Sequence, residues 1–132
     1  MHNCIILLGS NSDAEKNLPE ARKCLEQILC FEHYTTVIES PPYGGKGPSP
    51  YHNQMVEATT ALTFSQLKDT LKNIEKQLGR TQEDREQGIV IIDLDILQYD
   101  DTRHHLRDWE RPYVQQLLPQ LEGITHTDVV VG

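Results

Sequence analysis

Two aspartates stand two residues apart within an otherwise apolar segment, Ile89-Val90-Ile91-Ile92-Asp93-Leu94-Asp95-Ile96-Leu97. Side chains alternate between the two faces of a β-strand, so Asp93 and Asp95 share one face, about 7 Å apart along it. Carboxylates are costly to bury without a cation or hydrogen-bond donors, and their oxygens suit Mg²⁺, which also binds water and substrate phosphates. This aspartate pair therefore predicts a magnesium site. The competing interpretation is a polar strand face exposed to solvent.

The overall charge of the chain restricts the ligands that the aspartate pair could serve. The sequence contains 12 lysines and arginines against 20 aspartates and glutamates, a net charge of −8. Long-range repulsion from this charge disfavours nucleic acids and anionic membrane surfaces as partners. A nucleotide can bind only where metal ions and local basic groups neutralise its phosphates. An ATP site in this chain must therefore include a metal site.

The length of 132 residues fits one domain over 1–132, large enough to bury a core without disulfide bonds. The cysteines are odd in number and lack C-x-x-C spacing, which indicates small buried side chains at Cys4, Cys24 and Cys30. No apolar run is long enough to span a bilayer, and the chain opens on a strand-like run instead of a leader. We therefore expect a cytoplasmic protein, and an acidic surface without an apolar seam is compatible with a monomer.

Strand and helix signals surround the aspartate pair in a definite order. Apolar runs and β-branched content predict four strands, over 4–8, 31–39, 51–61 and 89–99. A first helix is expected to begin near Leu18, because Pro19 is tolerated only in a first helical turn. In the final third of the chain, the sequence predicts a helical stretch over 113–118 and a short strand over 129–131.

A second helix has the clearest local signals. Thr63 and Gln66 form a predicted capping box, and Gly79 stands where a helix-terminating glycine belongs. Between them, one apolar stripe recurs at helical spacing over Leu67, Leu71, Ile74 and Leu78. The order of elements predicts an α+β, ferredoxin-like β-α-β-β-α-β sandwich with an antiparallel sheet. Both helices would cover one face of the sheet, which leaves the other for a ligand cleft and a short C-terminal extension.

The aspartate pair belongs to a series of short motifs spread over residues 3–99. These are Leu8-Gly9-Ser10-Asn11, Ser40-Pro41-Pro42-Tyr43-Gly44, Tyr51-His52-Asn53, Ile74-Glu75 through Leu78-Gly79-Arg80, and Asp93-Leu94-Asp95-Ile96-Leu97. In order, and nearly in spacing, they resemble the signature of the 6-hydroxymethyl-7,8-dihydropterin pyrophosphokinases, from a G-S-N after the first strand to a D-L-D-I-L in the last. The resemblance agrees with the fold inferred from the strand and helix signals.

The resemblance implies the reaction of a 2-amino-4-hydroxy-6-hydroxymethyldihydropteridine diphosphokinase. Such an enzyme transfers pyrophosphate from ATP to 6-hydroxymethyl-7,8-dihydropterin in folate biosynthesis and releases AMP. By resemblance, Asp93 and Asp95 would hold two Mg²⁺ ions between the β- and α-phosphates of ATP. The residues assigned to the pterin would be Pro42, Tyr43, Gly44, Tyr51 and Asn53. Those assigned to the nucleotide would be Lys72, Glu75, Arg80 and Ile96.

The chain departs from the family where the phosphates should bind. The family has arginines and a tryptophan in the loop before the aspartate pair, whereas this chain has Gln82 and Val90 at two arginine positions and Gln87 at the tryptophan. Neither glutamine nor valine can replace a bidentate arginine contact. Candidate replacements follow the last strand: Arg103, Arg107 and Arg111, spaced by four as on one helix face, with His104, His105 and Tyr113. A solvated surface segment is the alternative for them.

Three interpretations remain open at this level. The chain is an active pyrophosphokinase with a rewired phosphate site, a catalytically degenerate relative that binds a pterin, a nucleotide or a partner protein, or an unrelated ferredoxin-like binding domain. Individual residues also have structural alternatives. Tyr51 and Asn53 could serve only the strand in which they lie, and Lys72 and Glu75 could belong to a solvated helix face.

Overall fold

The computed structural model describes residues 1–41, 50–79 and 86–125, with 122–125 as backbone only. Along the chain the elements are β1 (His2–Ser10), α1 (Ala14–Glu26), β2 (Cys30–Tyr34), β3 (Ile38–Ser40), β4 (Tyr51–Thr60), α2 (Phe64–Gln77), β5 (Asp93–Tyr99), β6 (Thr102–Arg103), the 3-10 helix η2 (Asp108–Glu110) and α4 (Pro112–Thr125). The predicted final strand over 129–131 lies outside the described residues. Within them, no helix combines the length and apolar character needed to cross a bilayer.

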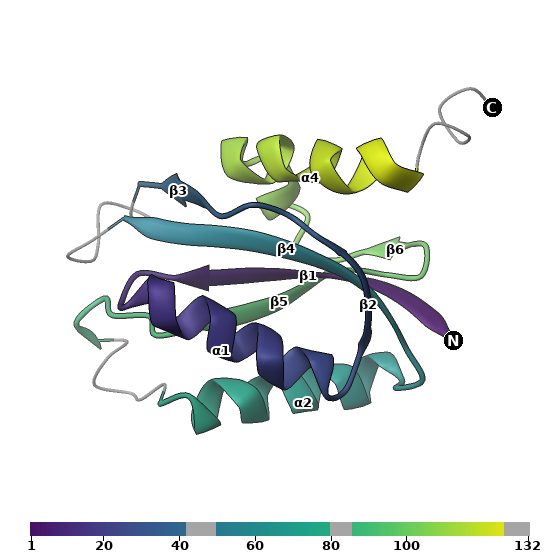
Figure 1. Cartoon of the computed structure of the whole chain (residues 1–132), viewed down its shortest axis with the longest axis horizontal. Helices are drawn as coiled ribbons and strands as arrows, with labels where there is room; N and C mark the ends of the chain where they lie inside the picture. The colour runs from purple at the N-terminus through teal and green to yellow at the C-terminus, as the bar shows by residue number, and fades with distance from the viewer. Residues whose placement is uncertain (42–49, 80–85, 126–132) are drawn as a thin grey trace.

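The strands form one antiparallel sheet in the order β2-β4-β1-β5-β6, and β3 pairs with the start of β4. Helices α1 and α2 cover one face of the sheet, and α4 lies across the other (Figure 1). Strands β1, β2, β4 and β5 alternate with α1 and α2 in the predicted β-α-β-β-α-β order, so the ferredoxin-like α+β fold is confirmed. The C-terminal extension is a full helix that covers the face left open by α1 and α2.

Both faces of the central strand β1 are buried, which explains its continuous apolar run. Ile6 and Leu8 point into the core beneath α1 and α2, where Leu25 and Leu67 also pack. Leu7 points the other way, into a second core beneath α4. That second core contains Leu7, Met55, Leu97, Trp109, Tyr113, Val114, Leu117 and Leu121.

Helix α2 forms as its sequence predicts. The Thr63 side chain accepts a hydrogen bond from the Gln66 backbone N–H, and the Gln66 side chain accepts one from the Thr63 N–H, which completes the capping box. Gly79 follows the helix at φ +104°, a conformation that favours glycine. The cap and the glycine set the ends of α2, and its buried side chains Leu67, Leu71 and Ile74 form the face that packs in the core.

Helix α1 begins at Ala14, and the prediction that it begins near Leu18 was wrong. Pro19 lies inside the helix, although its ring nitrogen cannot donate a backbone hydrogen bond there. Ala14, Leu18 and Leu25 all face the core on one side of the helix. Burial of this continuous face outweighs the local preference of proline for a first turn.

Two predicted strands are shorter than their sequence signals suggested. The strand over 31–39 is divided into β2 and β3, because Thr35 turns inward and its side chain accepts a hydrogen bond from the Met55 N–H (2.9 Å). Strand β5 begins at Asp93 instead of Ile89. Just before it, Val90 is tied to Asn11, whose N–H donates to the Val90 carbonyl (2.9 Å) and whose side-chain oxygen accepts from the Val90 N–H (2.6 Å).

Candidate functional site

The aspartate pair lies at the boundary between two cavities. The first, here called the α2 cavity, has a volume of about 520 Å³ and lies between α2 and the start of β5. The second, here called the α4 cavity, has a volume of about 170 Å³ and lies on the other face of the sheet, next to the start of α4. Asp93 and Asp95 line both cavities. Groups bound in the two cavities would therefore meet at these carboxylates.

The start of β5 offers backbone and side chains to a ligand because only one of its edges is paired by a strand in the described residues. Asp93, Leu94 and Asp95 pair with β1, whereas β6 pairs only with Gln98 and Tyr99 farther along. Leu94 is buried and both aspartates are partly exposed, so the predicted alternation of this strand is confirmed.

Glu75 stabilises this open edge from α2. Its carboxylate Oε2 accepts a hydrogen bond from the Leu94 N–H at 2.8 Å, and the residue is 7% exposed. The bond satisfies a backbone donor midway between Asp93 and Asp95 and so holds the strand that presents them. The interpretation of Glu75 as part of a solvated helix face was wrong. Glu75 lines the α2 cavity, but in this structure its carboxylate is used to position β5.

Four basic or imidazole side chains line the α2 cavity beside the aspartate pair. Lys68 and Lys72 come from consecutive turns of α2, and His104 and His105 follow β6. His105 Nε2 lies 3.8 Å from Asp95 Oδ1. The backbone N–H of His104 donates to the Leu97 carbonyl at 2.8 Å, which continues the pairing of β5 beyond β6. The cavity thus combines three carboxylates, those of Glu75, Asp93 and Asp95, with several potential cations.

Lys68 and Phe64 are members of the α2 cavity that sequence reasoning missed. Phe64 stacks on the His104 ring with centroids 4.3 Å apart and lines the cavity wall. The available signal was helical spacing: Lys68 precedes Lys72 by four residues and Phe64 precedes Lys68 by four, so all three share one face of α2. Ile96, assigned to the nucleotide by resemblance, also lines this cavity.

The α4 cavity contains the described residues that the resemblance assigned to a pterin. Tyr51 and Asn53 from β4 line it together with Tyr113 from the first turn of α4. Asn53 is buried, and its amide nitrogen donates to Ser40 Oγ (2.9 Å) and to the Ile38 carbonyl (3.3 Å). These bonds aim the side-chain amide and fix its orientation. Burial raises the pKa of the Tyr113 hydroxyl to about 12, so this group is uncharged near pH 7.

Gly9 leaves space on the floor of the α4 cavity. A Cβ added there would lie 3.6 Å from Asn53 Oδ1 and 3.9 Å from Tyr51 Cδ1. Those are ordinary contact distances, so the backbone does not forbid a side chain. A larger side chain would instead fill the volume between Tyr51 and Asn53. The glycine of the first motif therefore keeps this cavity open.

The three candidate arginines do not form one helical stripe, contrary to the prediction from their spacing. Arg103 lies in β6, whereas Arg107 and Arg111 flank η2. The Arg103 guanidinium lies over the Trp109 ring at 4.1 Å, and Arg111 Nε donates to Asp108 Oδ1 at 3.0 Å. Neither the α2 cavity nor the α4 cavity is lined by these arginines in the described part of the chain. Their contact with phosphate stays a prediction.

The donor set around the aspartate pair fits a magnesium ion. Asp93 and Asp95 contribute carboxylate oxygens to both cavities, and Asp108 adds a third carboxylate to the lining of the α4 cavity. Hard oxygen ligands with room for water and phosphate are what Mg²⁺ requires. Four predicted contacts lie outside the described residues: Pro42, Tyr43, Gly44 and Arg80.

The family model and the similar curated proteins all indicate the same family. The family model for 7,8-dihydro-6-hydroxymethylpterin-pyrophosphokinase matches residues 5–123. A mitochondrial folate synthesis bifunctional protein of Pisum sativum is 38% identical over 130 residues, covering 90% of this chain and 25% of that protein. The 2-amino-4-hydroxy-6-hydroxymethyldihydropteridine pyrophosphokinase of Bacillus subtilis is 32% identical over 127 residues, covering 88% of this chain and 75% of that protein. The Aquifex aeolicus protein of the same name is 36% identical over 95 residues, 71% of this chain and 59% of its own. The chain thus spans about a quarter of the plant relative.

Proposed function

Because the chain belongs to the 7,8-dihydro-6-hydroxymethylpterin-pyrophosphokinase family, we propose that it transfers pyrophosphate from ATP to 6-hydroxymethyl-7,8-dihydropterin. The observation that carries this proposal is the position of Asp93 and Asp95, which line both cavities at once. A two-substrate transfer needs such a boundary, because the acceptor hydroxyl must reach a phosphorus atom of the other substrate. In the reaction, the acceptor hydroxyl gives up its proton to the solvent and its oxygen forms a new bond to the β-phosphorus. The bond between the β-phosphorus and the oxygen that bridges it to the α-phosphorus breaks, and AMP leaves with that oxygen.

The pterin is proposed to bind in the α4 cavity. Its volume of about 170 Å³ is small, and Tyr51 and Tyr113 provide aromatic surface for a flat heterocycle. Asn53 provides an amide whose orientation is fixed by Ser40 and the Ile38 carbonyl. A pre-oriented polar group can form hydrogen bonds with the polar edge of a ring without the entropic cost of ordering a side chain.

ATP is proposed to bind in the larger α2 cavity, with its phosphates at the aspartate pair. Mg²⁺ held by Asp93 and Asp95 would supply charge neutralisation along the phosphates, the main requirement of phosphoryl-transfer chemistry. Lys68, Lys72 and His105 line the same cavity and are the proposed substitutes for the absent loop arginines. The family function then persists with a different set of cations. Cytoplasmic location and a monomeric state also remain predictions.

A catalytically degenerate relative is the second candidate, favoured by Gln82 and Val90 at positions where the family has arginines. Such a relative would bind a pterin, a nucleotide or a partner protein without catalysing the transfer. The loss of phosphate-binding arginines favours the form that keeps the pterin in the α4 cavity and loses the nucleotide.

The first test is calorimetric titration of the protein with the pterin and with a non-hydrolysable ATP analogue, the latter with and without Mg²⁺, followed by an assay for AMP release from ATP with the pterin present. We expect binding that requires Mg²⁺ and falls at least about tenfold in Asp95→Asn, since hydrogen bonds and contacts to charged groups contribute about 1.5–3 kcal/mol. Asp101→Asn is the matched control, because Asp101 is exposed in the β5–β6 turn. Nucleotide binding that neither requires Mg²⁺ nor weakens in Asp95→Asn would overturn the proposal. Binding of the pterin without binding of the nucleotide would establish the degenerate alternative.

The substitute cations have their own test. Lys68→Gln and His105→Asn are each expected to weaken the Mg²⁺-dependent binding of the ATP analogue by about threefold to tenfold, because each removes a contact to phosphate. Pterin affinity should stay unchanged, since neither residue lines the α4 cavity. Lys76→Gln on an exposed position of α2 controls for loss of net charge. Equal effects of Lys68→Gln and Lys76→Gln would contradict a specific phosphate contact.

A further inference from the structure

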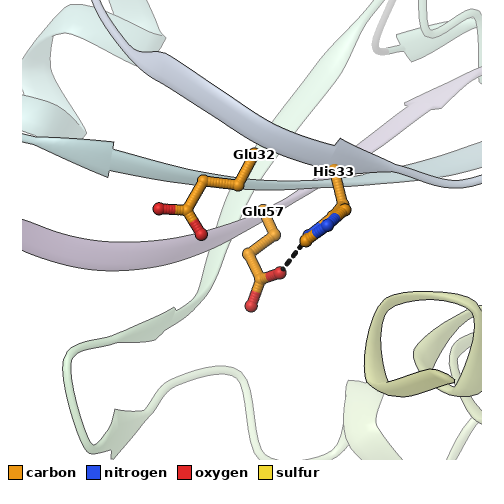
Figure 2. A group of neighbouring side chains, drawn as sticks. All are labelled: Glu32, His33 and Glu57. Atoms are coloured by element: carbon orange, nitrogen blue, oxygen red, sulfur yellow. Dashed lines mark hydrogen bonds and ion pairs between the residues drawn. The ribbon is translucent and has the colours of Figure 1, made fainter. Parts of the chain in front are cut away.

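A second cluster of metal-ligand side chains lies on β2 and β4, outside both cavities. His33 Nδ1 is 2.9 Å from Glu57 Oε1. One ligand atom from each of Glu32, His33 and Glu57 lies within 4.8 Å of the other two. Figure 2 shows the three side chains on the same side of the sheet, with the carboxylate of Glu57 between the other two. None of them lines the α2 or α4 cavity.

A β-bulge brings these three residues together. In a regular strand, the consecutive residues Glu32 and His33 would point to opposite faces. In β2, however, Phe31 pairs with Ala58 and His33 pairs with Glu57, so Glu32 is an extra residue opposite Glu57. A bulge of this kind places two side chains of one strand against one residue of its partner. The bulge thus interrupts the regular hydrogen-bonded pairing of β2 with β4 and places the three side chains close together.

The donor set suits a transition metal better than magnesium. One imidazole nitrogen and two carboxylate oxygens are ligands that Zn²⁺ binds at about 2.0–2.2 Å, so ligand atoms in one shell lie roughly 3–4 Å apart. The observed spread of up to 4.8 Å closes by rotation of Glu32, which is exposed, toward His33 and Glu57, whose side chains are 21% and 25% exposed. A divalent cation would also offset the repulsion between two adjacent carboxylates.

We propose that Glu32, His33 and Glu57 bind one Zn²⁺ ion, with water completing the coordination. The site is separate from the aspartate pair and from the proposed reaction. Its ligands come from both the outermost strand β2 and its neighbour β4, so bound metal would fasten the edge of the sheet and raise the stability of the fold.

The experiment is calorimetric titration of untagged protein with Zn²⁺ in the absence of nucleotide. We expect one ion per chain and an affinity that falls at least about tenfold in Glu32→Gln, His33→Asn and Glu57→Gln, as for the loss of a metal ligand. His52→Asn is the matched control: its Nε2 lies 3.0 Å from Glu39 Oε1 in another cross-strand pair, to which the described residues add no third ligand. Asp95→Asn is the second control: it should keep the zinc affinity of the wild type, which distinguishes the proposed site from the aspartate pair.

Thermal unfolding distinguishes a lost metal site from a damaged fold. His33→Asn should unfold at nearly the wild-type temperature without metal, lack the rise that Zn²⁺ produces in wild type, and keep Mg²⁺-dependent nucleotide binding. Zinc affinity unchanged in His33→Asn, or lost in Asp95→Asn instead, would overturn the proposal. A wild-type protein that binds no Zn²⁺ would leave only a His33–Glu57 ion pair and would overturn it equally.

Discussion

Glu75 shows how one side chain connects the packing of the fold to the site. It is a buried carboxylate on α2 that accepts the Leu94 N–H, and Leu94 stands between the two aspartates. Leu94 also packs in the core, so its position is restrained from two directions. Asp93 and Asp95 are therefore presented by a backbone held in place by a neighbouring helix, which limits how far the carboxylates can move apart.

Substitution of Glu75 tests this positioning role. Glu75→Ala leaves the buried Leu94 N–H without its acceptor, which should lower the free energy of unfolding by about 1–3 kcal/mol. Glu75→Gln keeps an acceptor oxygen and should recover most of that loss. Urea unfolding measures the stability, and the Mg²⁺-dependent affinity for an ATP analogue should weaken in Glu75→Ala and recover in Glu75→Gln. Identical stability for the two variants would contradict a role of the Leu94 bond.

Among the elements, α4 determines whether the second face of the sheet is exposed or buried. Without it, Leu7, Met55 and Leu97 would form an apolar surface on the face that α1 and α2 do not cover. The helix is anchored at its start by η2, since the Trp109 indole N–H donates to the His104 carbonyl and the Gln115 side chain donates to the Trp109 carbonyl. Through this junction α4 places Tyr113 in one cavity, while the segment before η2 places His104 and His105 in the other.

The packing of α4 has a direct mutational test. Leu117 is fully buried in the core beneath α4, so Leu117→Ala should lower the free energy of unfolding by about 2–5 kcal/mol. Leu106→Ala is the matched control, because Leu106 is 66% exposed and its truncation should stay within about 0.5 kcal/mol of wild type. Denaturant unfolding followed by circular dichroism measures both. Equal stability of the two variants would show that α4 is not held as the structure places it.

For the molecule as a whole, the proposed site depends on segments that are distant in sequence. The α4 cavity is lined from β1, β4, β5, η2 and α4, and the α2 cavity from α2, β5 and the segment after β6. A chain of net charge −8 repels a free triphosphate at long range. Lys68, Lys72 and the two histidines line the α2 cavity together with the aspartate pair, and this local cluster would make the proposed nucleotide site compatible with that charge.

The sequence by itself determined the features that depend on local order. The capping box and glycine stop of α2, the alternation around Asp93 and Asp95, and the β-α-β-β-α-β order follow from short-range propensity and periodicity, and the structure confirms them. The five motifs likewise led to the correct family, because they occur in a fixed order along the chain.

Only the tertiary structure decided the features that depend on burial and long-range pairing. Helix α1 continues past Pro19 because its apolar face packs in the core. Glu75 is buried instead of solvated because its carboxylate accepts the Leu94 N–H. Arg103 lies in β6 and Arg107 and Arg111 flank η2, so the three arginines do not share the one helix that their spacing suggested. The proximity of Glu32, His33 and Glu57 depends on the register of β2 against β4. That register is selected by contacts between residues far apart in the sequence, so no short segment of the sequence predicts it.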